Sequence, residues 1–325
     1  VDDDQETTSY ATFGHIDYRL TDQLSLSAGV RYTKEEKTYS NERLTLLSGA
    51  PLASFSFAGE DDWSSVTPSL ALEQQWSDDL MTYASVARGF KSGGFNGRAA
   101  SGSETESFDP EKVWTYEIGL KTSWAEGRST LNMAVFYNDY EDFQARVSDV
   151  VDGPSISFAL PVLNAGELQT QGVELEFAAN PTDQINLFAA VGYLDAEYKE
   201  FSDALGDRSD DIVPFAPEWT MRFGGGYTIP LAHAAGVTLG ADASFKSDHY
   251  LSVDNQDVLT QDDYWVYNAH IRYEADNGLY LSATVKNIAN EVYKTDAQEF
   301  SSVANVQTAY YGDPRTWAVA AGYKF

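Results

Sequence analysis

Apolar side chains recur at every second position over long stretches of this 325-residue chain. In residues 265–273, the alternating apolar residues are separated by Asn268, His270 and Arg272. Strict alternation indicates a β-strand with one apolar and one polar face. The pattern returns in residues 24–32, 114–124, 173–177, 219–229 and 317–323. Sustained helical periodicity is hard to find, so the sequence predicts an all-β chain.

The connections between these stretches alternate between short and long. The short ones are rich in Asp, Asn, Gly and Pro, as tight hairpins require, and they are 21–23, 77–79, 125–128, 180–184, 230–236 and 275–278. The long ones are roughly 38–61, 91–110, 146–166, 199–213, 247–261 and 289–312. This alternation predicts an antiparallel up-and-down meander of about thirteen strands, with turns on one side and loops on the other.

Two architectures can use such strands. A soluble sandwich or propeller buries the apolar face and usually has strands of about five or six residues. A membrane barrel turns the apolar face toward lipid, needs about 9–11 residues per strand and carries aromatic girdles. The strands here are about ten to fifteen residues long, and aromatic residues lie near their ends: Trp63 and Trp76, Trp114 and Trp124, Trp219 and Tyr227, Trp265 and Tyr273, Trp317 and Tyr323. These features favour a transmembrane β-barrel.

The bulk composition excludes several other classes. The net charge is -29, which opposes binding to the phosphate backbone of a nucleic acid. The chain has no cysteine, so thiolate metal sites, iron–sulfur clusters, cysteine nucleophiles and disulfides are excluded. No apolar run of about 18 residues predicts a transmembrane helix, and no signal peptide is recognisable. If the protein is exported, we therefore expect this sequence to be a mature product or a fragment.

Four stretches resemble the C-terminal part of the barrel in TonB-dependent outer-membrane receptors. They are YASVARGFKSGGFNGR (83–98), FDPEKVWTYEIGLKTSW (108–124), VKNIANEVY (285–293) and YYGDPRTWAVAAGYKF (310–325). The last one also resembles the closing strand that the bacterial outer-membrane assembly machinery reads, ending on Phe325 at the periplasmic rim. Phe325 at that rim would place every short turn on the periplasmic side and every long loop outside.

The resemblance implies active uptake of a scarce nutrient, most commonly a ferric siderophore and otherwise cobalamin, haem or oligosaccharides. It implies a 22-stranded barrel in the bacterial outer membrane, in contact with lipid and lipopolysaccharide, and an N-terminal plug through which the TonB complex acts. We expect residues 1–325 to be the C-terminal portion of this barrel, without the plug and the N-terminal strands. A second polypeptide that completes the barrel is the alternative, because open edges are not tolerated in lipid.

Charged residues on the predicted inner face are the main candidates for a site. By strand parity they are Arg19, Arg31, Glu73, Arg88, Glu117, Lys121, Glu174, Glu176, Arg222, Asp242, His270, Arg272 and Lys286. Some are expected to contact ligand, namely Arg88, Arg222, His270 and Arg272. Others are expected to line the lumen or hold the plug, namely Arg19, Arg31, Glu117, Lys121, Glu174, Glu176 and Lys286, with Arg19, Glu174 and Lys286 nearest the periplasm. A lumen wall that is polar for solvation alone is the alternative.

The external loops offer further candidates. The glycine-rich segment 91–109 lacks the Gly-Lys-Ser/Thr ending of a phosphate loop, but Lys91, Asn96 and Arg98 could contact an anionic ligand. Acidic clusters could bind calcium, although none has EF-hand spacing: Asp207, Asp210 and Asp211; Asp254 and Asp257; Asp262 and Asp263. The histidines His15, His233, His249 and His270 have no metal-ligand spacing. We predict no catalytic site, no metal site and no cofactor.

Two other functions remain open at this stage. A passive diffusion channel would have an open lumen and no plug. An outer-membrane enzyme would need a converging Ser–His pair or paired carboxylates, for which the sequence has no motif such as GxSxG.

Overall fold

The structure is a computed structural model. It describes residues 2–47, 50–97, 105–146, 149–151, 157–159, 162–203, 206–233, 235–253, 255–300 and 306–324. Within these ranges, the only helical element is one 3-10 turn, η2 (Asp257–Leu259). A helix with the length and apolarity needed to cross a membrane is not found among the described residues.

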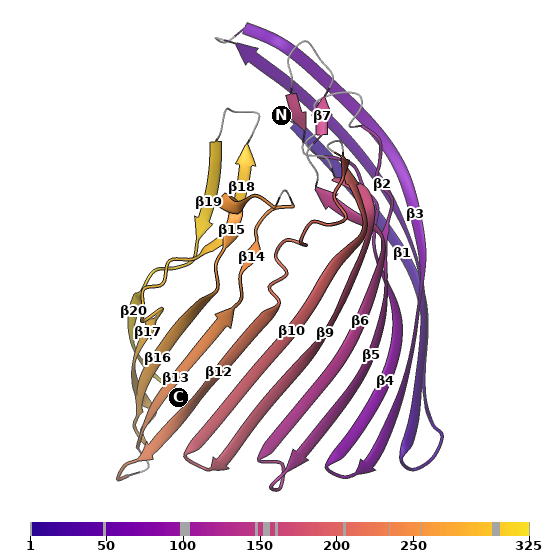
Figure 1. The fold of residues 1–325 in the computed structure, drawn as a ribbon. Coiled ribbons are helices and arrows are strands. Elements are labelled where there is room, and N and C mark those ends of the chain that lie inside the picture. The colour runs from indigo at the N-terminus through magenta and orange to yellow at the C-terminus, as the bar shows by residue number, and fades with distance from the viewer. Residues whose placement is uncertain are drawn as a thin grey trace.

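Thirteen antiparallel strands follow one another in chain order and form one curved sheet (Figure 1). They are β1 (Asp2–Arg19), β2 (Leu24–Leu47), β3 (Ala50–Ser77), β4 (Leu80–Lys91), β5 (Glu111–Trp124), β6 (Ser129–Arg146), β9 (Val162–Thr182), β10 (Ile185–Asp203), β12 (Trp219–Pro230), β13 (Gly236–Lys246), β16 (Tyr264–Glu274), β17 (Leu279–Lys286) and β20 (Thr316–Tyr323). The all-β antiparallel meander predicted from the alternating pattern is confirmed.

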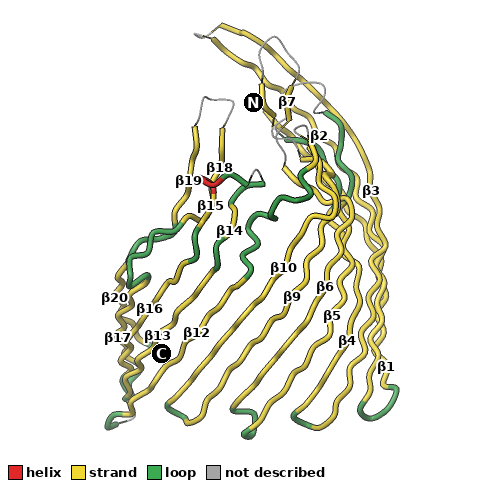
Figure 2. The backbone as a smooth tube through the Cα atoms, viewed as in Figure 1, coloured by secondary structure: helices red, strands yellow, loops and turns green. Residues whose placement is uncertain are grey.

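The remaining strands are short and belong to the long connections (Figure 2). They form the pairs β7 (Asp149–Val151) with β8 (Ser157–Ala159), β14 (His249–Tyr250) with β15 (Thr260–Gln261), and β18 (Lys294–Phe300) with β19 (Val306–Tyr311), while β11 (Gly206–Asp207) pairs with β10. Local hairpins therefore supply part of the order in the long connections.

The short turns gather at one end of the sheet and the long connections at the other, as predicted (Figures 1 and 2). Gly278 shows how tight the turns are: its φ is +86°, and a Cβ there would lie 2.3 Å from the carbonyl oxygen of Lys324. Only glycine fits such a position without strain. These two ends are called here the short-turn end and the long-loop end.

The segment 38–61, predicted as a long loop, is mostly strand instead. β2 and β3 continue through it, with Asn41 opposite Phe57 and Tyr39 opposite Gly59. At about 3.3 Å per residue, the 28 residues of β3 extend about 90 Å, far more than a hydrocarbon core of about 30 Å. The upper part of this hairpin therefore needs no outward apolar face, which explains why the alternation fades there.

The outward face of the sheet is apolar and exposed. Ile118 is 67 % exposed, Trp317 74 % and Val319 77 %. Ladder partners point to the same side of a sheet, and Trp317 pairs with Val285 while Val319 pairs with Ala283. A face this apolar and this exposed fits contact with lipid.

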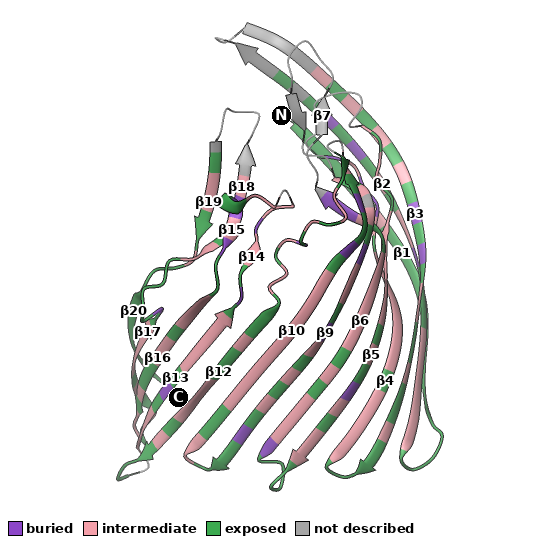
Figure 3. Cartoon of the chain, in the orientation of Figure 1, coloured by how far each residue is buried: buried purple, intermediate pink, exposed green. Residues whose placement is uncertain are grey.

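The membrane-spanning part of the sheet is called here the wall. Buried residues concentrate beyond the wall, toward the long-loop end (Figure 3). One cluster comprises Ala145, Leu168, Tyr198, Phe201 and Val213, and a second comprises Leu251, Leu259 and Ala297. The predicted girdle residue Trp63 is only 7 % exposed and shares the inner face with Asp61 and Gly59. Its assignment to the lipid girdle was wrong, because it lies in the part of β3 above the wall and packs against Phe95.

Candidate functional site

An open groove of about 710 Å³ lies on the inner face of the sheet, where β9, β10, β12 and β13 run side by side below the long connections. Arg222 of β12 stands on its floor, opposite Ala190 of β10 and Ser244 of β13. The guanidinium lies over the ring of Phe188, 5.3 Å from its centroid, and 3.8 Å from a carboxylate oxygen of Asp242. The side chain remains 61 % exposed, so it is available to a bound anion.

Charges of both signs surround Arg222. Glu174 and Glu176 of β9 line one side of the groove, and Lys246 and His249 line the other. The His249 ring is oriented by the hydrogen bond between its Nδ1 and the carbonyl oxygen of Ser247, at 2.9 Å. The groove therefore has an acidic side and a basic side, an arrangement that suits a ligand carrying both a metal and anionic groups.

Aromatic rings form the far edge of the groove. Tyr264 and Tyr293 stack with their centroids 4.5 Å apart and an interplanar angle of 12°, and both line the groove. Lys294 follows Tyr293, and its ammonium donates to the carbonyl oxygens of Val258 and Thr260 at 3.3 and 2.6 Å. Lys294 therefore ties this edge to the connection after β13.

Arg88, predicted on the inner face, points outward. It pairs with Trp114 in the β4–β5 ladder, and its guanidinium lies 5.7 Å from the centroid of the Trp114 ring. Both faces of β4 carry small residues, so alternation alone does not decide which face is outward. An arginine on the lipid side is tolerated near the top of the wall because its long side chain can reach the interface.

Two of the residues predicted nearest the periplasm lie elsewhere. Lys286 is the last residue of β17, which rises from the turn at Gly278, so Lys286 stands at the upper end of that strand opposite Thr316. Glu174 lies near the middle of β9, which ends at Thr182. Arg19 does lie at the short-turn end, as the last residue of β1.

The glycine-rich segment after β4 is anchored to its neighbours. Asn96 is buried, and its side-chain amide exchanges two hydrogen bonds with the backbone of Val162, at 2.6 and 3.4 Å. Lys91 ends β4 opposite Glu111. Arg98 lies outside the described residues. The described part of this segment thus fastens the loop, and its role in ligand binding stays a prediction.

The other predicted inner residues lie apart from the groove. Arg31 donates to Thr33 at 3.1 Å, while Glu117 accepts from the Tyr83 hydroxyl at 2.5 Å and Lys121 lies over the same ring. His270 and Arg272 belong to the lower part of β16. There, Arg272 stacks on Tyr280 at 4.0 Å and pairs with Glu274 at 3.2 Å.

The sequence reading missed most of the groove. Lys246, Tyr264 and Tyr293 were not singled out. Lys246 and Tyr264 pair with each other at the upper ends of β13 and β16, and the alternation that puts Arg222 and Ser244 on the inner face puts both of them there too. Tyr293 belongs to a connection, where period two gives no face.

Two of the acidic loop residues have local partners. Asp207 accepts hydrogen bonds from Ser209, which lower the pKa of Asp207, and Asp211 accepts from Arg208. Among the described residues no group of three or more His, Cys, Asp or Glu could hold a metal ion; Asp254 lies outside them.

The sheet, its lipid-facing exterior and its inner groove define a class of outer-membrane barrel proteins. Residues 1–288 match the family described as TonB dependent receptor-like, beta-barrel, and the chain belongs to this family of TonB-dependent receptors. It is therefore a protein of the bacterial outer membrane, as the resemblance implied. The C-terminal Phe325, on which the position of the short turns was first argued, lies outside the described residues.

Curated relatives are receptors, and they are longer than this chain. The pesticin receptor of Yersinia pestis is 27 % identical over 88 % of this chain and 39 % of its own length. The ferric-pyoverdine 358 receptor of Pseudomonas putida is 26 % identical over 95 % of this chain and 34 % of its own length. The chain thus spans between a third and two fifths of these relatives.

Solved structures share the fold. The ferric yersiniabactin uptake receptor FyuA from Yersinia pestis superposes with a TM-score of 0.81 at 22 % identity, over 97 % of this chain and 45 % of that one. The siderophore receptor PiuA from Acinetobacter baumannii gives a TM-score of 0.78 at 22 % identity, over 100 % and 44 %.

Proposed function

We propose that the complete protein is a receptor that binds a ferric siderophore outside the cell and imports it with energy delivered through TonB. The observation that carries this proposal is the groove at Arg222, which offers cations and stacked aromatic rings to an anionic chelate. The similarity to a ferric-pyoverdine receptor and to a ferric yersiniabactin uptake receptor supports it.

The chain corresponds, in this proposal, to the C-terminal portion of a larger barrel of 22 strands. Two observations support this: the chain covers 45 % of the yersiniabactin receptor, and the order of the sheet runs from β1 to β20 without pairing these two edge strands among the described residues. The plug and the first strands belong to a part of the protein outside this sequence, and TonB acts through that plug.

The remaining partners follow from the two faces of the wall. The outward apolar face contacts outer-membrane lipid, and its upper rim contacts lipopolysaccharide. A nucleic acid is not a partner, since the net charge is -29. Transport proceeds by binding and gated passage, without a catalytic residue or a cofactor.

The experiment is uptake of a radioactive ligand by cells that produce the complete receptor. The label is iron in ferric siderophores and haem, cobalt in cobalamin and carbon in glycans, each supplied in turn. Uptake of one ferric siderophore that disappears when TonB is deleted supports the proposal. Uptake that persists without TonB and rises linearly with concentration would indicate the passive channel instead.

A matched pair of variants then tests the groove. Hydrogen bonds to charged groups contribute about 1.5–3 kcal/mol, so Arg222→Gln should raise the Kd of the transported chelate about tenfold or more. Arg128→Gln is the control, since Arg128 pairs with Asp183 at the short-turn end, away from the groove. Equal Kd values for both variants and wild type would place the binding site elsewhere.

A further inference from the structure

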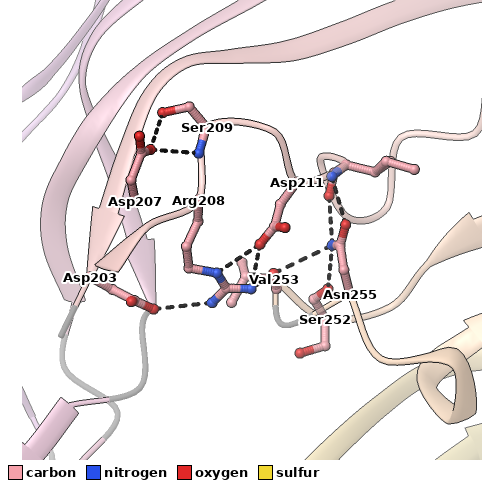
Figure 4. A network of polar contacts seen from close by, with 9 residues as sticks. Asp203, Asp207, Arg208, Ser209, Asp211, Ser252, Val253 and Asn255 are labelled. Atoms are coloured by element: carbon pink, nitrogen blue, oxygen red, sulfur yellow. Dashed lines mark hydrogen bonds and ion pairs between the residues drawn. The ribbon is translucent and has the colours of Figure 1, made fainter. Parts of the chain in front are cut away.

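The long connections and the strand ends that pack with them at the long-loop end are called here the external layer. Arg208 joins three segments of this layer. It lies in the connection between β10 and β12, and its guanidinium donates to the carboxylates of Asp203, at 3.1 Å, and Asp211, at 2.7 Å, and to the carbonyl oxygen of Val253 (Figure 4). The side chain is 11 % exposed, and that of Asp203 is fully buried. The guanidinium also lies 5.6 Å from the ring centroid of Phe201.

Asn255 makes a second link between the same two connections. Its side-chain oxygen accepts from the backbone N–H of Ile212 at 2.6 Å, and its amide donates to the Ile212 carbonyl at 2.9 Å (Figure 4). Asn255 has a φ of +46°, in the left-handed region that asparagine tolerates better than most residues. One side chain therefore replaces a strand partner for Ile212.

A backbone link and an apolar cluster complete the junction. The N–H of Phe215 donates to the carbonyl oxygen of Tyr250 at 2.9 Å. Val253 packs against the cluster that contains Tyr198 and Phe201.

The two connections joined in this way supply part of the groove. Phe215 and Pro217 line it from the connection after β10, and His249 lines it from the connection after β13. The Phe215–Tyr250 hydrogen bond holds Phe215 beside the chain neighbour of His249. The links of Arg208 to Asp211 and Val253, four positions from Phe215 and from His249, brace the same two connections.

We propose that Arg208 is a positioning residue that fixes these two connections as one rigid unit and so presents a preformed rim to the ligand. Capture does not require these two connections to close over the ligand. Arginine suits this role because Nε, Nη1 and Nη2 donate in different directions from one rigid plane, whereas a lysine ammonium concentrates its three donors on one atom. The rigid unit is argued from the contacts of Arg208 and Asn255, whereas its role in ligand binding rests on the proposed function.

The test of rigidity uses spin labels in the complete receptor. This chain has no cysteine, and any cysteine elsewhere in the complete receptor is replaced by serine. Asp210→Cys and Asp257→Cys, at two exposed positions, then place one label on each connection. We expect a narrow distribution of distances between the labels without ligand, and the same distribution with saturating ferric siderophore. Adding Arg208→Ala should broaden it, and Arg208→Lys should broaden it nearly as much.

Two further variants make the result interpretable. Asn255→Asp removes the donor to Ile212 at almost unchanged volume and should broaden the distribution partially, which covers the case in which Arg208→Ala fails to fold. Arg128→Ala removes an arginine that also contacts a carboxylate and a carbonyl, at the short-turn end, and should leave it unchanged. A broad distribution in wild type, or a narrow one in all three junction variants, overturns the proposal.

The binding arm uses ferric pyoverdine and ferric yersiniabactin as probes, together with any siderophore found in the uptake assay. Arg208→Lys should raise the Kd at least tenfold, mainly through faster dissociation, while Arg128→Ala leaves it unchanged. Unchanged affinity in Arg208→Lys with a broadened label distribution would overturn the positioning role. Absence of binding in wild type with the narrow distribution intact would count against the proposed function and leave the rigid unit standing.

Discussion

The spanning wall and the external layer of this protein are built on different principles. In the wall, the apolar side chains of the outward face, such as Ile118, are exposed and do not pack into a protein core. In the external layer, side chains such as Phe201 are almost completely buried against one another. The wall thus relies on its backbone ladder and on lipid, whereas the external layer is stabilised by packing, as a soluble domain is.

The sharpest test of this contrast is Phe201→Ala. Truncating a buried phenylalanine usually costs about 3–5 kcal/mol, and Phe201 is 1 % exposed. We expect the loss to stay in the external layer, because the wall strands below it keep their ladders. Hydrogen exchange should speed up in residues 198–203 and 206–218 and remain unchanged in β12 and β13; faster exchange throughout would mean that the two regions unfold together.

The second test breaks the wall without touching the external layer. Ile118→Arg places a charge near the middle of the lipid-facing side of β5, where an arginine costs about 2–4 kcal/mol. Asn132→Arg on the neighbouring strand is the control, since Asn132 shares the inner face with Lys121 and Glu176. Unfolding in urea from lipid vesicles measures both, and equal losses would show that Ile118 does not face lipid.

The third test concerns the boundary between the regions. A Cβ at Gly93 would lie 2.4 Å from both the Phe108 carbonyl oxygen and the Trp63 ring, so Gly93→Ala should destabilise the loop by about 1–3 kcal/mol. Gly97→Ala, where nothing lies within 4 Å, should be almost neutral. Thermal unfolding of both variants, followed by tryptophan fluorescence, compares them; similar melting temperatures would contradict the packing of Gly93 on Trp63.

The smallest effect is expected at the short-turn end. Arg128 and Asp183 are 2.7 Å apart and well exposed, and exposed pairs contribute about 0–1 kcal/mol. Arg128→Gln should therefore change unfolding in vesicles little, and added salt should erase the difference. A loss above 2 kcal/mol that persists in salt would mean that the turns, too, carry packing energy.

Sequence reasoning succeeded where one physical rule acts on every residue. Lipid on one side imposes period two, so the outward positions of Trp317, Val319 and Ile271 follow directly. It failed where a lipid-facing position need not be apolar. Arg88 can face outward because an arginine near the interface reaches water.

The junctions of the external layer leave no local signal in the sequence. Arg208 meets Val253 across 45 positions of the chain, and Asn255 meets Ile212 across 43. Neither contact follows from spacing or alternation, and Tyr293 enters the groove from a connection, where alternation gives no face. The fold could therefore be predicted to the level of strand count and topology. Of the groove residues, Arg222 was predicted to contact ligand, and Glu174 and Glu176 were predicted to line the lumen or hold the plug.

The unequal height of the wall has a consequence for traffic at the cell surface. β3 has 28 residues and β20 only 8, which correspond to about 90 Å and 26 Å of extended chain. A small chelate can diffuse past this tall hairpin with little hindrance. Over the described strands, a body as large as a folded protein would therefore meet the β2–β3 hairpin before it reaches the upper end of β20.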